Sequence, residues 1–191
     1  MRPLYRLCTA AIVATAACAA VLAATRPAAL ASPLASSLAR VEPPATGAAP
    51  DFTGIDHWLN GPPQSLAQLR GKVVLVDFWT YTCINCIHTL PYVERWHEKY
   101  RAQGLAVIGV HTPEYPFERS TDKVRDAVRR FGLTYPIAQD NEYATWRAYG
   151  NQYWPAFYLI DKSGNIVYRQ FGEGDYQKTE AEIAKLITQP G

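Results

Sequence analysis

The sequence predicts an α/β domain with a central mixed β-sheet flanked by helices. Apolar runs of strand length alternate with segments whose apolar residues recur at helical spacing, a pattern typical of strand–helix–strand crossovers. Near the C-terminus two such runs are separated by a short turn, which predicts a hairpin. Hydrophobic residues make up 48% of the 191 residues and charged residues 19%, a balance typical of a folded domain rather than a disordered chain.

The N-terminus has the pattern of an export signal over residues 1–31. Arg2 and Arg6 precede a run without charge over 7–24, and the tripeptide 29–31 (Ala-Leu-Ala) fits the small-x-small pattern of a cleavage site. A cleaved signal peptide is the favoured interpretation, and an uncleaved membrane anchor is an alternative. We therefore expect an exported protein of the periplasm or cell envelope, which contacts the membrane only through its N-terminus if that segment is retained.

The export signal contains two of the four cysteines, Cys8 and Cys18. A lipoprotein modified at Cys18 is a further alternative for the N-terminus. After cleavage the chain would keep only Cys83 and Cys86, so no structural disulfide is expected besides whatever this pair forms.

Residues 32–50 are predicted to be a flexible linker, because they are mostly Pro, Ala and Ser with almost no large apolar side chain. The folded domain is expected over 51–191. A net charge of only +2 argues against a nucleic-acid binder that uses a basic surface.

The first strand of the domain is predicted over 72–79, a nearly continuous Val-rich apolar run that is typical of a strand buried on both faces. From Cys83 onward the apolar residues change to helical spacing, with Trp96 and Tyr100 on the apolar face. Gly104 is expected to end this helix.

A second buried strand is predicted over 105–110. Residues 119–131 have apolar side chains at positions i, i+4 and i+7, which predicts a helix that Gly132 stops. Asp140 or Asn141 can cap a short helix that follows.

The C-terminal part is predicted to be a hairpin followed by a helix. Strands over 156–161 and 166–171 flank a turn at 162–165. The final helix shows apolar residues at helical spacing, and Thr179 and Glu182 have the spacing of a capping box.

The chemistry of the sequence centres on Cys83 and Cys86, which follow the first buried strand at the start of a helix. Residues i and i+3 of a helix lie on one face, so the two sulfurs can approach to the ~2 Å of a disulfide bond. The free N–H groups of a helix N-terminus stabilise a thiolate. We expect Cys83 to be the exposed attacking thiol, and Cys86 to be the covered resolving thiol of thiol–disulfide exchange.

Other interpretations of this pair have less support. A zinc site needs two further ligands, and His88 and His111 do not supply them at suitable spacing, so no metal is expected. A purely structural disulfide across two residues would close almost no loop and add little stability. The segment 80–83 reproduces the Thr-x-x-Cys part of a peroxiredoxin site without the proline expected upstream, so a thiol-dependent peroxidase is an alternative.

The pattern Trp-x-x-x-Cys-x-x-Cys between a strand and a helix resembles the thioredoxin superfamily. Asp77, six residues before the first cysteine, matches the buried acid of that family, Trp79 matches the aromatic residue beside its site, and Pro91 matches its helix-kinking proline. Trp154 and Pro155, just before a predicted strand, match its cis-proline loop. The resemblance implies a thioredoxin fold over roughly residues 52–187.

The segment 112–140, between the second core strand and the cis-proline loop, resembles the insertion of exported TlpA/ResA-like and redoxin-type members. More narrowly, the chain resembles the thioredoxin-like domain of DipZ-type proteins in four stretches, RGKVVLVDFWTYTCINC, GVHTPEYPFE, YWPAFYLID and FGEGDY. In that family the domain is joined to a CcdA-like membrane electron carrier. The resemblance therefore implies a membrane thiol carrier of the CcdA type as a partner.

The resemblance assigns proton transfer to Asp77. A buried carboxyl has a raised pKa, and it could take the proton from Cys86 as that sulfur attacks a mixed disulfide. An ion pair between Asp77 and Lys72 is the alternative.

The same resemblance implies a docking site for substrate shaped by Trp79, Trp154 and Pro155, although Trp79 could equally be a core residue. Pro155 has no N–H, so the backbone beside it can be presented to a substrate strand. Ile84 and Asn85, between the two cysteines, are expected to tune the redox potential. Neither carries a positive charge, so we expect a pair that favours reduction of substrates.

These observations predict an exported thiol–disulfide oxidoreductase that reduces disulfides in envelope proteins. Its partners would be protein thiols and disulfides, and it would need no cofactor besides the redox-active disulfide Cys83–Cys86. A peroxidase, a disulfide-forming oxidant, and a non-enzymatic binding module with an aromatic groove are the alternatives. Fold alone does not decide the direction of electron flow.

Overall fold

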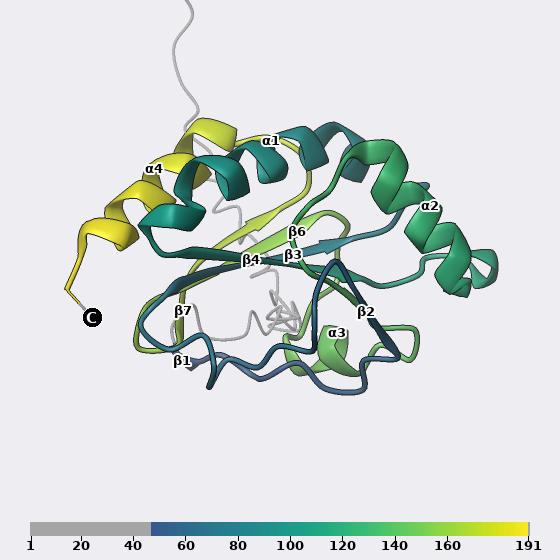
Figure 1. Ribbon diagram of the computed structural model, residues 1–191, viewed down its shortest axis with the longest axis horizontal. Helices are drawn as coiled ribbons and strands as arrows, with labels where there is room; N and C mark the ends of the chain where they lie inside the picture. The colour runs from purple at the N-terminus through teal and green to yellow at the C-terminus, as the bar shows by residue number, and fades with distance from the viewer. Residues whose placement is uncertain (1–46, 191) are drawn as a thin grey trace, which may run out of the picture. The chain divides into compact units, whose positions relative to one another are not determined.

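The computed structural model describes residues 47–190 and has a seven-stranded sheet at its centre (Figure 1). In sheet order the strands are β1 (Gly47–Ala48), β7 (Asn165–Phe171), β6 (Ala156–Ile160), β3 (Val73–Trp79), β4 (Leu105–His111), β5 (Ile137–Gln139) and β2 (His57–Leu59). The helices are α1 (Ile84–Tyr100), α2 (Thr121–Phe131), α3 (Ala144–Ala148) and α4 (Tyr176–Thr188), with short 3₁₀ helices η1 (Arg101–Gln103) and η2 (Pro116–Arg119). The predicted α/β class is confirmed, and the sheet contains two short N-terminal strands, β1 and β2, that were not predicted.

Strand β3 is the centre of the sheet, parallel to β4 and antiparallel to β6. All seven of its residues are buried, because apolar clusters cover both faces. One cluster lies under the helices α1, α2 and α4, and the other lies between the sheet and α3. This two-sided burial explains the Val-rich run in the sequence.

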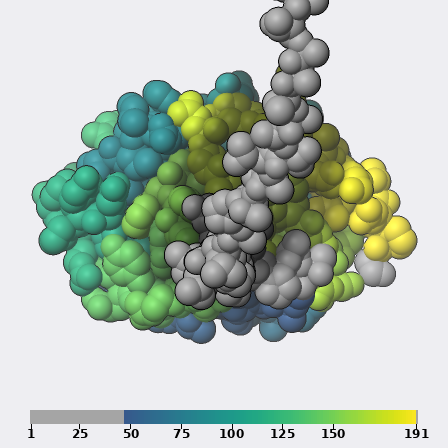
Figure 2. Space-filling view, turned by 180° about the vertical axis from the view of Figure 1, so that it is seen from behind, coloured from purple at the N-terminus to yellow at the C-terminus, as the bar shows by residue number. Residues whose placement is uncertain are grey.

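The helices form a layer over one face of the sheet. Helix α1 connects β3 to β4 and α2 connects β4 to β5, each as a crossover between parallel strands. Figure 1 shows α1 between α4 and α2, and the view from behind in Figure 2 again places α4 and α2 at opposite sides. The short helix α3 lies on the other face of the sheet (Figure 1).

Helix α1 begins directly after the loop that follows β3. Leu90, Val93 and Trp96 form its buried face. The chain continues through η1 to Gly104, which has a φ of 102°. This left-handed conformation favours glycine and ends the helical segment at the predicted residue.

The N-cap residue of helix α3 is Tyr143, but the side chain of Asp140, one of the two predicted caps, binds the N–H groups of its first turn. The Asp140 carboxylate accepts hydrogen bonds from the backbone N–H of Thr145 at 3.3 Å and of Trp146 at 2.8 Å. The helix follows β5. β5 pairs antiparallel with β2, a three-residue strand too short to produce a recognisable alternation.

Two predicted boundaries differ from the structure. Of the linker predicted over 32–50, the structure describes only 47–50, and Gly47–Ala48 there pairs with β7 as strand β1. The predicted capping box is wrong, because α4 begins at Tyr176 and Thr179 lies inside the helix. The Thr179 hydroxyl instead lies 3.0 Å from that of Tyr168 on β7, so the residue contributes to packing between helix and sheet.

The predicted export signal over 1–31 lies outside the described residues and stays a prediction. Within 47–190, no helix is both long enough and apolar enough to cross a membrane.

Leu75→Ala should lower the free energy of unfolding by about 2–5 kcal/mol, because it leaves a cavity at a fully buried position of β3. Val167→Ala, at a position on β7 that is 38% exposed, should cost less than about 1 kcal/mol. Urea titrations of the full chain followed by circular dichroism would measure both. Equal losses in the two variants would contradict the central place of β3 in the core.

Candidate functional site

Three loops leave the sheet at the edge where β3 ends. Because β3 and β4 are parallel, the loops that follow Trp79 and His111 start at the same edge. β6 is antiparallel to β3, with Ala156 opposite Phe78, so the chain enters β6 from this edge as well. The cysteine loop, the loop 112–119 and the segment around Pro155 are therefore neighbours.

Cys83 and Cys86 lie one turn apart at the start of α1, as predicted. Cys83 is half-buried and Cys86 is fully buried. The backbone N–H of Cys86 donates a hydrogen bond to the Cys83 sulfur at 3.4 Å. The first cysteine is thus the one that a substrate can reach, and the second lies in the core beneath it.

The two thiols differ in their tendency to ionise. The hydrogen bond from the Cys86 thiol lowers the pKa of Cys83 to about 7, with further hydrogen bonds from the backbone N–H groups of Cys86 and Asn85. Burial, and then the proximity of Cys83, raise the pKa of Cys86 far above that of an ordinary thiol. Near neutral pH Cys83 is therefore partly thiolate while Cys86 keeps its proton, which is the division that an attacking and a resolving thiol require.

Asp77 is completely buried on β3. Neither of its carboxylate oxygens has a hydrogen-bond partner among residues 47–190, so the alternative ion pair with Lys72 does not form. Burial, followed by the nearby Cys83, raises the pKa of Asp77 to about 8, as the sequence predicts for a buried acid. Asp77 in turn contributes to the raised pKa of Cys86, although burial is its main cause.

Trp79 does not form a wall of the docking site. Its side chain is fully buried, and its ring packs edge-on against His111 with 5.2 Å between ring centroids. The docking role predicted for Trp79 is therefore wrong, because its fully buried ring has no surface that a substrate could contact. The alternative prediction, a core residue, describes its position.

Trp154 is half-buried beside the site. Its indole Nε1 donates a hydrogen bond to the carbonyl of Thr112 at 3.0 Å, and its ring packs on Trp146 with 4.1 Å between centroids. The peptide bond between Trp154 and Pro155 is cis, and Pro155 itself is buried. Trp154 thus presents one edge to solvent and connects the proline segment to the loop after β4.

Exposed apolar side chains lie next to the cysteines. Ile84 is 60% exposed, and Asn85 beside it is also exposed. On the loop 112–119, Tyr115 and Phe117 are about half exposed and stack with 5.6 Å between ring centroids. We call Ile84, Tyr115 and Phe117 the apolar rim, and their exposure is the feature expected of a surface that binds another polypeptide.

Glu118 is the residue of this site that sequence reasoning missed. It is fully buried, and its carboxylate accepts hydrogen bonds from the Thr82 hydroxyl and from the backbone N–H groups of Glu114 and Tyr115, the last two at 2.6 and 2.9 Å. Burial opposes its ionisation, but these hydrogen bonds, led by that of Thr82, hold the pKa of Glu118 below its ordinary value. A Pro-x-Glu sequence at 116–118, which is typical of a helix start, is the signal that could have identified it.

The two histidines considered as metal ligands have other contacts. His88 is exposed and pairs with Glu173 at 3.1 Å. His111 is buried, stacks against Tyr81 and lies 3.3 Å from the Thr80 hydroxyl, and burial lowers its pKa to about 4. Within the described part of the chain, no three His, Cys, Asp or Glu side chains are grouped as a metal ion would require.

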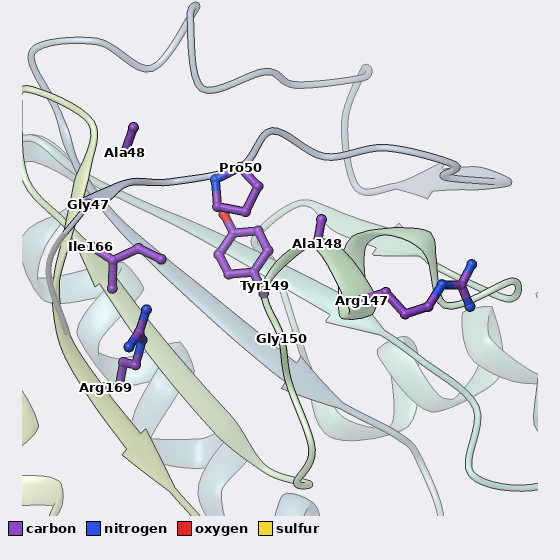
Figure 3. A pocket seen from close by; sticks show the side chains of 9 residues that line it. All are labelled: Gly47, Ala48, Pro50, Arg147, Ala148, Tyr149, Gly150, Ile166 and Arg169. Carbon is purple, nitrogen blue, oxygen red and sulfur yellow. The ribbon is translucent and has the colours of Figure 1, made fainter. Parts of the chain in front are cut away.

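A hollow of about 260 Å³ on the other face of the sheet is separate from the cysteine site. It lies between β1, β7 and the segment 147–150, and none of its lining residues comes from the three loops described above. In Figure 3 the Tyr149 ring points towards Pro50, whereas the side chain of Arg147 points away.

Asp77→Asn should remove one pH dependence of stability. Folded Asp77 keeps its proton up to about pH 8, whereas an unfolded aspartate loses it near pH 3.9. Raising the pH from 4 to 8 therefore lowers the free energy of unfolding of the wild-type chain through this residue. The variant should not show this decrease. Urea denaturation across this range measures it, and a constant difference between wild type and Asp77→Asn would contradict the raised pKa.

Comparisons with known proteins agree with this geometry. A sequence profile described as Redoxin matches residues 44–187. The chain is 54% identical over 144 residues to the protein DipZ of Mycobacterium bovis, an alignment that covers 74% of the chain but 21% of DipZ. It is also 32% identical to the thiol-disulfide oxidoreductase ResA of Bacillus thuringiensis, with 72% of the chain and 76% of ResA covered.

A solved structure supports the fold independently. The solution structure of a thioredoxin-like protein in the oxidised form superposes with a TM-score of 0.69 at 30% identity, over 75% of this chain and 97% of the other. The predicted thioredoxin fold is thus confirmed, as is the resemblance to DipZ. The chain belongs to the redoxin family and has a thioredoxin-like fold.

Proposed function

We propose that the protein is an exported reductase of disulfide bonds in envelope proteins. The observation that carries this proposal is the pairing of an accessible Cys83, whose pKa is about 7, with a buried Cys86 that shares the core with Asp77. The Cys83 sulfur can attack at neutral pH. The Cys86 sulfur is shielded from solvent and can react only with a mixed disulfide formed on Cys83. ResA, a relative that covers most of this chain, is named a thiol-disulfide oxidoreductase.

The reaction consists of two displacements at sulfur. The Cys83 thiolate attacks one sulfur of a substrate disulfide, the substrate S–S bond breaks, and the first substrate thiolate leaves and takes a proton from solvent. Cys86 then gives its proton to Asp77 and attacks the Cys83 sulfur. The Cys83–Cys86 disulfide forms, the second substrate thiolate leaves, and two electrons have passed from the protein to the substrate.

A larger fraction of Asp77 is ionised at the step that needs a base. Cys83 is one of the two causes of its raised pKa, after burial. Once Cys83 is bonded to substrate it carries no charge, so this contribution disappears and the carboxyl ionises more readily. An ionised Asp77 can then accept the Cys86 proton.

The apolar rim supports a polypeptide as substrate. Ile84 lies next to Cys83, and Tyr115 and Phe117 lie on the loop that Glu118 ties to Thr82. Exposed aromatic side chains of this kind are typical of contact surfaces for proteins rather than of pockets for small solutes.

The proposed source of electrons is a membrane thiol carrier of the CcdA type. The support for it is the similarity to DipZ, of which the chain spans 21%, together with the export signal predicted over 1–31. A carrier of this kind would reduce the Cys83–Cys86 disulfide and return both thiols after each cycle.

Cys86→Ser should trap substrates as mixed disulfides, because the resolving thiol is missing while Cys83 still attacks. Cys83→Ser is the matched control and should trap nothing. Both full-length variants would be incubated with cell envelopes, alkylated and analysed by non-reducing electrophoresis and mass spectrometry. Absence of trapped proteins with Cys86→Ser would contradict the proposed function.

The reduction potential of the Cys83–Cys86 pair should lie near or below about −230 mV, in the range of thiol pairs that donate electrons. Neither Ile84 nor Asn85 contributes a positive charge that would stabilise the thiolate further. Equilibration of the protein against a glutathione or dithiothreitol buffer measures the potential. A value near about −120 mV would reverse the direction and make the protein an oxidant of secreted proteins.

A further inference from the structure

Asp77 and Gly109 lie opposite each other on the paired strands β3 and β4. Trp79 is two residues after Asp77, so its side chain extends from the same face of β3. A Cβ atom added to Gly109 would lie 3.1 Å from the indole nitrogen of Trp79. The Trp79 nitrogen therefore lies over the backbone of Gly109, on the side of the sheet where the Asp77 carboxyl is buried.

Tyr135 reaches the same place from the segment before β5. The Gly109 N–H donates a hydrogen bond to the carbonyl of Pro136 at 3.0 Å, which holds Tyr135 beside β4. A Cβ atom on Gly109 would lie 2.9 Å from the Cε2 atom of Tyr135 and 2.7 Å from the Cδ1 atom of Ile137, closer than such atoms approach. Glycine at 109 thus allows the hydroxyl-bearing end of the Tyr135 ring to approach the backbone next to Asp77.

These three polar groups share one property. Both carboxylate oxygens of Asp77, the Nε1 of Trp79 and the hydroxyl of Tyr135 are buried without a hydrogen-bond partner among residues 47–190. Buried polar groups rarely stay unpaired, since each loses its hydrogen bonds to water without replacement. A buried water molecule normally makes about three hydrogen bonds, and this site provides two donors and one acceptor group.

We propose that Tyr135 and Trp79 bind one buried water molecule against Asp77, and that Tyr135 thereby positions the proton that Asp77 receives from Cys86. This inference rests on the proposed function only in one respect, that the proton comes from Cys86 during thiol–disulfide exchange. The Tyr135 hydroxyl and the Trp79 N–H donate to the water, and the water donates to the carboxylate. The ionised form of Asp77 is stabilised in this way, so Tyr135 makes the carboxyl a base at a lower pH than burial alone would allow.

The surrounding charges are consistent with a donating phenol. Cys83 and Cys86 interact electrostatically with Asp77, as Glu94 does with Tyr135. The His97 ring of α1 packs against Tyr135 with 5.8 Å between ring centroids. Burial, and then Asp77, raise the pKa of Tyr135 well above its ordinary value. The Tyr135 hydroxyl therefore stays protonated and can act as a hydrogen-bond donor.

Tyr135→Phe tests the inference, with Tyr149→Phe as the matched control. Tyr149 is also buried with an unpartnered hydroxyl, but it belongs to the cluster on the other face of the sheet. The pKa of Asp77 would be followed through its side-chain ¹³C signal in the full chain, in a Cys83→Ser background so that no thiolate titrates in the same range. Asp77→Asn identifies the signal.

Tyr135→Phe should raise the pKa of Asp77 by about 0.5 to 1, the size expected when one hydrogen bond to a carboxylate is lost. Tyr149→Phe should change it by less than about 0.2. An unchanged pKa in Tyr135→Phe, or an equal rise in both variants, would overturn the inference. Because this titration does not depend on a substrate, it stays informative even if Cys86→Ser traps no protein.

A measurement on the unaltered chain covers the case in which Tyr135→Phe does not fold. A bound water at this site should give a magnetisation-transfer cross-peak between water and the indole N–H of Trp79. The indole N–H of Trp154 donates to a carbonyl and serves as the comparison signal. Absence of the Trp79 cross-peak at short and long mixing times would overturn the inference.

Discussion

The burial of one ionisable carboxyl in the central strand is the constraint on which the rest of the site depends. A charged group without partners costs several kcal/mol in a protein interior, so Asp77 is stable there chiefly in its neutral form. The apolar side chains that surround it on β3 and its neighbours offset this cost. The same strand leads into the cysteine loop, so the core that tolerates the acid also determines where both thiols lie.

One helical turn separates two very different environments for sulfur. At the N-terminus of α1 the Cys83 sulfur meets hydrogen-bond donors and solvent, which favour its ionised form. Three residues later Cys86 is inside the apolar cluster under the helices, where its proton is retained. The geometry of a single turn is therefore sufficient to make chemically identical side chains act as attacking and resolving thiols.

The sequence predicted the elements whose burial and backbone conformation depend on neighbouring residues along the chain. The Val-rich run of β3, the amphipathic face of α1 and the glycine at 104 were readable because burial and backbone conformation at these positions follow from the residues themselves. Strand β2 could not be predicted, and the choice between docking site and core for Trp79 could not be made, because both depend on which distant segment packs against them. At Thr179 a local pattern was misleading. Its spacing to Glu182 is that of a capping box, but its hydroxyl is hydrogen-bonded to Tyr168 of the sheet. Of the site, the cysteines and Asp77 came from motif and chemistry. The helix-start signal at Glu118 was available in the sequence, but its hydrogen bond to Thr82 is visible only in the folded loop.

The carboxylate of Glu118 accepts hydrogen bonds both from Thr82, the neighbour of the attacking cysteine, and from the loop that displays Tyr115 and Phe117. One side chain, Glu118, therefore holds both the loop with the exposed aromatic residues and the residue before the attacking cysteine. A sequence change that moves the loop 112–119 also changes the hydrogen bonding of Thr82, the residue before Cys83. The shape of the proposed binding surface and the position of the attacking thiol therefore cannot change independently during evolution. Diversification of substrate choice in proteins built this way should proceed through the exposed tips at 115 and 117, which leave the hydrogen bonds of Glu118 intact.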